Sequence, residues 1–165
     1  MRTTLDQALP HDNPSSYIAA SYIKFVEAGG ARAVPILYDD SNENITNIFK
    51  SVNGLLFPGG GADGCTGRYF EVVSMLFDLA IEANNDGDYF PIHATCLGFE
   101  QLAVKVSGNC SILTNFSAED AASPLLLLPG ADKSALLGGD DTDMKWLRKR
   151  VAATPPLAME NHNFG

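Results

Sequence analysis

The sequence predicts an α/β fold, a doubly wound, mostly parallel sheet with flanking helices. Helix-like and strand-like patterns alternate along the chain, and two apolar runs end in residues that suit the carboxyl edge of such a sheet. The first run ends in Pro58-Gly59-Gly60-Gly61 and the second in Thr95-Cys96. The length of 165 residues, with 45% hydrophobic and 19% charged residues, fits one globular domain. We therefore expect a single domain over 1–165, with a disordered leader over 1–15.

The first half of the chain holds three helix-like segments, with a strand-like segment between the first two. Residues 16–28 form an amphipathic helix pattern whose core stripe is Ile18, Tyr22, Phe25 and Val26. Residues 33–38 have the apolar pattern of a strand. Helices over 43–52 and 69–84 follow, with inward faces formed by Ile45, Ile48, Phe49 and Val52 in the first and by Val72, Val73, Leu76, Leu79, Ala80 and Ala83 in the second.

The second half is less regular once the helix after Cys96 has ended at Gly108. The spacing in that helix predicts a core-facing side formed by Phe99, Leu102, Ala103 and Val106. Residues 123–130 fit either a strand or an apolar loop. Residues 140–151 predict a helix, because acids occupy its first turn and bases its last, as the helix dipole favours. A strand over 157–159 would then lead to His162.

Cys96 lies where the apolar run ends and a helix-like segment begins. On a sharp strand-to-helix turn a side chain is held above the sheet edge, beside free N–H groups and the positive end of the helix dipole. Both favour the thiolate, which is the reactive form of cysteine. The small Gly98 lets strand and helix pack closely. A buried structural cysteine is the alternative, and the context favours the nucleophile.

The glycine run can supply hydrogen-bond donors to the same edge. Attack of a thiolate on a carbonyl creates an oxyanion that needs such donors. Because the carboxyl ends of parallel strands meet at one edge, we expect the N–H groups of Gly60 or Gly61 and of Leu97 to lie beside Cys96. Taken alone, the glycine run fits a flexible turn equally well.

Several segments, in the right order, resemble the γ-glutamyl hydrolases of the class I glutamine amidotransferase-like superfamily. The resemblance extends from Tyr17 to Cys110 and resumes at 157–162. It rests on five stretches of sequence, namely Tyr17–Phe25, Gly30–Pro35, Phe49–Gly60, Asn85–Pro91 and Thr95–Glu100. It implies a flavodoxin-like fold that is incomplete in this chain.

The implied activity is that of a cysteine-type γ-glutamyl peptidase, an omega peptidase that hydrolyses folylpoly-γ-glutamates. Cys96 would form a γ-glutamyl thioester while Gly60, Gly61 and Leu97 hold the oxyanion. Substrate contacts are implied for Gly59, Glu100 and His162. Glu100 either orients the substrate amine or a water, or acts as a first-turn acid that disfavours the Cys96 thiolate. No cofactor and no metal site is expected.

The chain departs from the family at both ends. The family's general base lies in a His-Pro-Glu motif, whereas the histidines here are His11, His93 and His162, and His93 should point to the sheet face opposite Cys96. We therefore expect slower turnover. Without the first strand of the family, an unpaired edge is expected to pair with another chain, as in a homodimer. Two alternatives stay open, an impaired γ-glutamyl-binding relative and a glutaminase module that supplies a partner synthetase with ammonia.

Charge and composition limit the classes of partner and the cellular locations that we expect. The formal net charge of −9 argues against nucleic acid, whose phosphates would be repelled. No apolar run reaches membrane-spanning length, and no signal-peptide pattern opens the chain. The family resemblance implies a lysosomal, vacuolar or extracellular location, and sequons at Asn44, Asn109 and Asn115 agree with it. Cys96 is free if Cys65 and Cys110 pair, but their spacing does not decide this.

Overall fold

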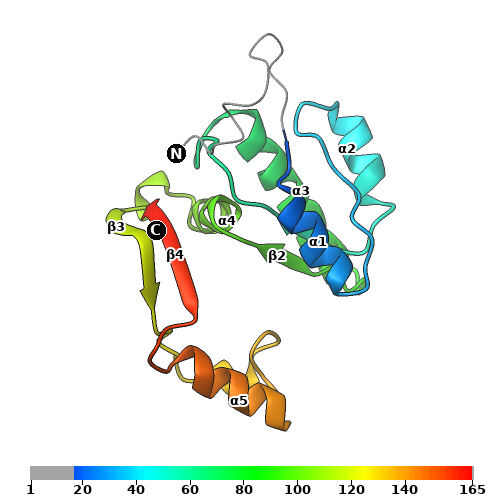
Figure 1. The fold of residues 1–165 in the computed structure, drawn as a ribbon. Helices are drawn as coiled ribbons and strands as arrows, with labels where there is room; N and C mark the ends of the chain where they lie inside the picture. Colours follow the sequence, from blue (N-terminus) through cyan, green and yellow to red (C-terminus); the bar gives the residue numbers. More distant parts are fainter. Residues whose placement is uncertain (1–16, 165) are drawn as a thin grey trace. The chain divides into compact units, whose positions relative to one another are not determined.

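The computed structural model describes residues 17–164, so the predicted leader and His11 lie outside the described residues. The chain divides into two compact units, Met1–Leu113 and Thr114–Gly165, whose elements are drawn in Figure 1. The single domain over 1–165 stays a prediction. Among residues 17–164, none of the helices combines the length and the apolarity that crossing a bilayer requires.

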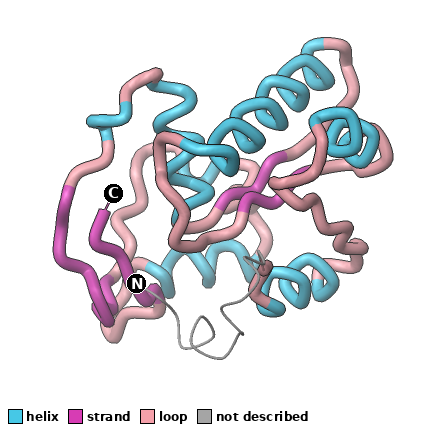
Figure 2. Tube along the Cα trace, turned by 90° about the horizontal axis from the view of Figure 1, so that it is seen from above, coloured by secondary structure: helices cyan, strands magenta, loops and turns pink. Residues whose placement is uncertain are grey.

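The first unit is an α/β structure built around a pair of parallel strands. Figure 2 shows these two short strands among the helices of the unit. Leu55 pairs with Ile92 and Phe57 with Ala94, so the two strands end at the same edge. The elements in order are α1 (Ala20–Ala28), α2 (Asn42–Phe49), β1 (Leu55–Phe57), α3 (Gly67–Asn85), β2 (Ile92–Ala94), α4 (Leu97–Ser107) and the short 3₁₀ helix η1 (Cys110–Ile112).

The core of this unit lies between α2, α3 and the strands, as the helical spacing predicted. The rings of Phe49 and Phe90 lie 4.4 Å apart between centroids. The Asn84 side chain donates to the Phe90 carbonyl and accepts from the Phe90 N–H, which fixes the end of α3 to the residues before β2. The buried cluster consists of Ile45, Phe49, Phe57, Val72, Val73, Leu76, Ala80 and Phe90.

The strand predicted over 33–38 is wrong, because these residues form no strand. A strand requires a hydrogen-bonded neighbour, and within residues 17–164 β1 and β2 pair only with each other. Pro35 also lacks the N–H that a ladder would use. The core stripe predicted on α1 is only partly confirmed, since Phe25 is 61% exposed and its ring lies against His93 instead.

The helix after Cys96 is confirmed, but the prediction of its inward face is only partly confirmed, since Leu102 packs against the core and Ala103 is half-buried. Phe99 and Val106 are 65% and 71% exposed. The buried residues of α4 are Leu97, Gly98, Gln101 and Val104. Gly98 determines this orientation, because its missing side chain lets the helix approach the backbone of Phe57 in β1. The face of α4 that approaches β1 most closely is buried, although the face with Phe99 is more apolar.

The second unit holds an antiparallel pair of strands and one α-helix. Its elements are β3 (Asn115–Ser123), η2 (Ala131–Lys133), α5 (Thr142–Val151) and β4 (Ala158–Phe164). The predicted helix at 140–151 is confirmed, and the Asp141 carboxylate caps it by accepting the Met144 N–H, which lowers the pKa of Asp141. Residues 124–128 form a loop, and the predicted strand leading to His162 is β4. The sequence did not predict β3.

Candidate active site

Cys96 sits on a strained turn between β2 and α4. Its φ of 56° and ψ of −125° place a residue with a side chain at positive φ, outside the regions that such residues normally adopt, which costs about 1–3 kcal/mol. The flanking hydrogen bonds hold this conformation. Thr95 N–H donates to the Phe57 carbonyl at 3.1 Å, and the Cys96 carbonyl accepts from the N–H groups of Phe99 and Glu100 at 2.9 and 3.0 Å. The thiol is free and half-buried. The sharp strand-to-helix turn predicted at Cys96 is confirmed, and the role of Cys96 as nucleophile stays a prediction.

The close approach of helix and strand depends on Gly98. A Cβ at this position would lie 2.7 Å from the Phe57 carbonyl carbon and 2.8 Å from the Phe57 Cβ. Real Cβ atoms do not approach so closely, so only glycine fits while the backbones stay in place. Gly98 therefore has the packing role that the sequence predicted for it.

The glycine run lies directly against the thiol. A Cβ on Gly59 would lie 2.8 Å from Cys96 Cβ, 3.1 Å from Cys96 Sγ and 2.7 Å from Tyr22 Oη. The Cys96 thiol and the Tyr22 hydroxyl therefore both lie beside the position that a side chain on Gly59 would occupy. Gly59 N–H donates to Tyr22 Oη at 2.8 Å, so this donor is already used. The structure thus brings together the two strand ends that the sequence placed at one edge.

Among the described residues, three N–H groups that follow Gly59 and Cys96 in the chain have no protein acceptor. Within residues 17–164, the N–H groups of Gly60, Gly61 and Leu97 donate no hydrogen bond to another protein group. A Cβ on Gly60 would lie 3.8 Å from the Leu97 side chain, so the loop and the start of α4 are in contact. Unused donors next to a nucleophile can bind a developing oxyanion. The roles assigned to these three residues stay predictions.

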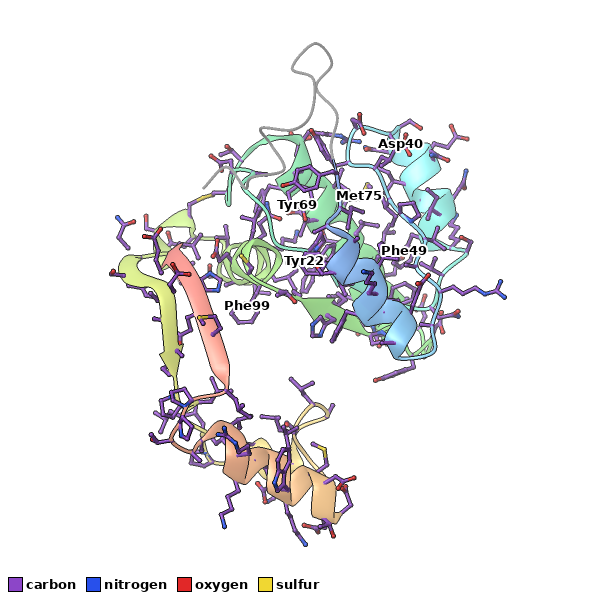
Figure 3. The ribbon with its side chains drawn as sticks, viewed as in Figure 1. Tyr22, Asp40, Phe49, Tyr69, Met75 and Phe99 are labelled. Atoms are coloured by element: carbon purple, nitrogen blue, oxygen red, sulfur yellow. A yellow bond between two sulfur atoms is a disulfide. The ribbon has the colours of Figure 1, made fainter. Side chains whose placement is uncertain are left out.

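The structure adds two tyrosines that the sequence interpretation treated as packing residues or left aside. Tyr22 comes from α1 and Tyr69 from the first turn of α3, and Figure 3 labels both. Burial, with a further contribution from the neighbouring Tyr22, raises the pKa of Tyr69 to about 12. The Tyr69 hydroxyl donates to the Pro58 carbonyl at 3.5 Å. The sequence signal that could have pointed to these tyrosines is a hydroxyl group on a helix face that is otherwise apolar.

The structure places Glu100 close to the thiol, with a carboxylate oxygen within 4.8 Å of Cys96 Sγ. Glu100 is half-buried in the first turn of α4, and both interpretations of its role stay open. His162 lies in β4 opposite Ala118, in the second unit, so its contact with substrate stays a prediction. His93 is exposed, its ring lies 5.3 Å from that of Phe25, and its Nε2 lies 3.3 Å from Thr95 Oγ1.

Cys65 and Cys110 form a disulfide, which resolves the pairing that the spacing left open. Their Cα atoms are 5.7 Å apart, and the bond joins the loop after β1 to η1. Cys96 is therefore the free thiol among the cysteines.

Comparison with known proteins agrees with this geometry. A model of the peptidase C26 family matches residues 2–116, which include the glycine run and Cys96. The chain is 40% identical to gamma-glutamyl hydrolase 1 of Arabidopsis thaliana over 95% of its length, and 38% identical to gamma-glutamyl hydrolase B of Dictyostelium discoideum over 91%. It is 42% identical to the gamma-glutamyl hydrolase of Homo sapiens over 78%. These matches cover 44%, 42% and 40% of the relatives, so the chain spans less than half the length of the curated relatives it matches. The chain belongs to the peptidase C26 family.

Proposed function

We propose that this chain carries the nucleophile and the oxyanion donors of a γ-glutamyl hydrolase, a cysteine peptidase that cleaves γ-glutamyl bonds. One observation supports the proposal: Cys96 stands on a strained turn with its sulfur against Gly59, and the N–H groups that follow in each segment, those of Gly60, Gly61 and Leu97, have no acceptor among residues 17–164. The names of the relatives and the family match support the γ-glutamyl bond as the one attacked.

The chemistry follows from these groups. The Cys96 thiolate forms a bond to the γ-carbonyl carbon, and the carbonyl electron pair moves to the oxygen, where the backbone N–H groups stabilise it. When the tetrahedral intermediate collapses, the C–N bond breaks and the leaving amine takes up a proton. Water then attacks the thioester carbon, which releases the γ-carboxylate and restores the Cys96 thiol. Glu100 and Gly59 would contact the substrate beside the reacting bond.

We base the substrate, assembly and location of the protein on the family resemblance, and the location also on two features of the chain. We assign poly-γ-glutamyl folates to the whole protein as its substrates. We also assign to it a doubly wound sheet, a contact between His162 and the substrate, and pairing as a homodimer. A disulfide is typical of proteins in oxidising compartments. The sequon residues Asn44, Asn109 and Asn115 are all exposed. Both features support a lysosomal, vacuolar or extracellular location.

The direct test is acylation of the full chain by N-acetylglutamic acid γ-(p-nitrophenyl) ester. Its good leaving group needs no protonation, so the test depends on the nucleophile and the oxyanion donors alone. We expect a burst of one nitrophenolate per chain and one N-acetylglutamyl group on the peptide that contains Cys96. Cys96→Ala should abolish the burst, and the isomeric α-ester should react more slowly. Equal labelling of parent and Cys96→Ala, or equal rates with both isomers, would contradict the proposal.

A further inference from the structure

The loop from Pro58 to Thr66, which we call the oxyanion loop, carries the proposed donors and has no regular secondary structure. A loop of this kind is positioned by side-chain contacts, because no helix or sheet ladder determines its backbone. Its first residues lie against Cys96 and Leu97. The contacts that hold its second half therefore decide where the Gly60 and Gly61 N–H groups lie.

Gln101 makes the most informative of these contacts. It is 0% exposed and is the buried polar residue in the part of the chain that the structure describes. Its Nε2 donates to the Asp63 carbonyl at 3.0 Å, while its Oε1 has no hydrogen-bond partner among residues 17–164. Burying a carboxamide that is only half satisfied is unfavourable, so an apolar residue of the same length would suit the core better. The bond to Asp63 is what the carboxamide adds at this position.

The disulfide holds the same loop at a second point. Cys65 is joined to Cys110, just after α4, and Gly64 between the two attachments lies against the side chains of Leu113 and Leu97. The Asp63 carboxylate accepts the N–H groups of Cys65 and Thr66 at 2.8 and 2.7 Å, which makes this part of the loop a compact turn. Both attachments run to α4 or to the residues directly after it. The helix that begins at Cys96 is thus also the element to which the loop is fastened.

We propose that Gln101 is a positioning residue for the reaction at Cys96. By holding the Asp63 carbonyl to α4, it keeps the Gly60 and Gly61 N–H groups at hydrogen-bonding distance from the oxyanion, and the disulfide is the second clamp. This inference rests on the proposed function, because an oxyanion forms only when Cys96 attacks a carbonyl. Donors must lie about 2.7–3.1 Å from the oxyanion to act, so a displacement of the loop by about 1 Å removes most of their effect.

Two reactions of the same thiol separate positioning from general damage. Acylation by the γ-nitrophenyl ester forms the C–S bond through a tetrahedral oxyanion, and the C–O bond then breaks to release nitrophenolate. Alkylation by iodoacetamide forms a C–S bond as the C–I bond breaks, with no oxyanion. In both, the thiol proton passes to the buffer. A variant that only displaces the oxyanion loop slows the first reaction and leaves the second unchanged.

The variants are made in the full chain. Gln101→Met keeps the length of the side chain and removes the donor, so we expect acylation of Cys96 to slow by about tenfold to a hundredfold. Alkylation should stay within about twofold of the parent rate, as fits a change confined to the oxyanion donors. Ser74→Ala is the matched control, because Ser74 Oγ in α3 is also buried without a hydrogen-bond partner among the described residues and so makes no hydrogen bond to the oxyanion loop. It should change neither rate.

The double variant Cys65→Ser, Cys110→Ser releases the second clamp and provides a test if Gln101→Met does not fold. It should show the same selective loss of acylation. Unchanged acylation in the folded variants, or an equal loss of acylation and alkylation, would overturn the positioning role. If the parent chain is alkylated at Cys96 but never acylated, the proposed function itself fails, and the role of Gln101 fails with it.

Discussion

Replacing Gly98 by alanine has two opposing effects of known size on the free energy of unfolding. Alanine is a better helix former than glycine by up to about 1 kcal/mol in a helix interior, mainly because it lowers the conformational entropy of the unfolded chain. Against this, the new Cβ would lie 2.7 Å from the Phe57 carbonyl carbon and 2.8 Å from its Cβ. Backbone atoms cannot rotate away as a flexible side chain can, so α4 must move off β1.

The steric cost should exceed the gain in propensity. Overpacking of this kind costs about 1–3 kcal/mol, and the gain is reduced because Gly98 is only the second residue of α4. We expect a net loss of about 1–2 kcal/mol in the free energy of unfolding. For a unit of this size that corresponds to a fall in melting temperature of about 4–8 °C per kcal/mol.

Urea unfolding followed by circular dichroism at the helix band measures this loss. Fluorescence would report on the wrong unit, because the single tryptophan, Trp146, lies in α5. Gly60→Ala is the matched control for stability, since its Cβ would meet the Leu97 side chain at an ordinary 3.8 Å. Its effect on the free energy of unfolding should stay within about 0.5 kcal/mol. A Gly98→Ala variant as stable as the parent, or more stable, would refute the reasoning.

Two further predictions concern pH. The N–H groups of Cys65 and Thr66 hold the pKa of Asp63 below its usual 3.8, so the stability it contributes is present above about pH 4 and is lost as the pH falls through the lowered value. Asp63→Asn keeps an acceptor oxygen, and its melting temperature should depend less on pH in this acidic range; an unchanged acid dependence would count against the capping role. Burial raises the pKa of Tyr69 from 10.0 to about 12, so its contribution is present below pH 10 and is lost as the pH rises through about 12. Tyr69→Phe should lose less stability in alkali, measured by unfolding against pH, and equal losses in both proteins would exclude Tyr69 as the cause.

Local patterns predicted most helices correctly because local features determine them. The inward faces of α2 and α3 follow from apolar residues at helical spacing, and α5 begins at a carboxylate that caps it. The turn at Cys96 was predictable for the same reason, since an apolar run, a small residue and a helix pattern meet there. The opposition of Cys96 and the glycine run followed from a general rule for the ends of parallel strands.

Other features required contacts between distant residues. Residues 33–38 have a strand pattern but no neighbour to pair with in the described chain. In α4, the spacing favoured Phe99 and Val106, yet the approach of Gly98 to Phe57 turned the face with Gln101 inward. Tyr22 is 37 residues from Gly59, and no local pattern shows that its hydroxyl accepts the Gly59 N–H.

Most helices and the strand-to-helix turn at Cys96 could be predicted from local sequence, because each depends on residues close together in the chain. The roles of the site residues stay predictions. Tertiary structure alone decided which side of α4 is buried, that Cys65 pairs with Cys110, and that Gln101 fastens the oxyanion loop. These depend on distances between atoms of residues 38 to 45 positions apart, which only the packed backbone sets.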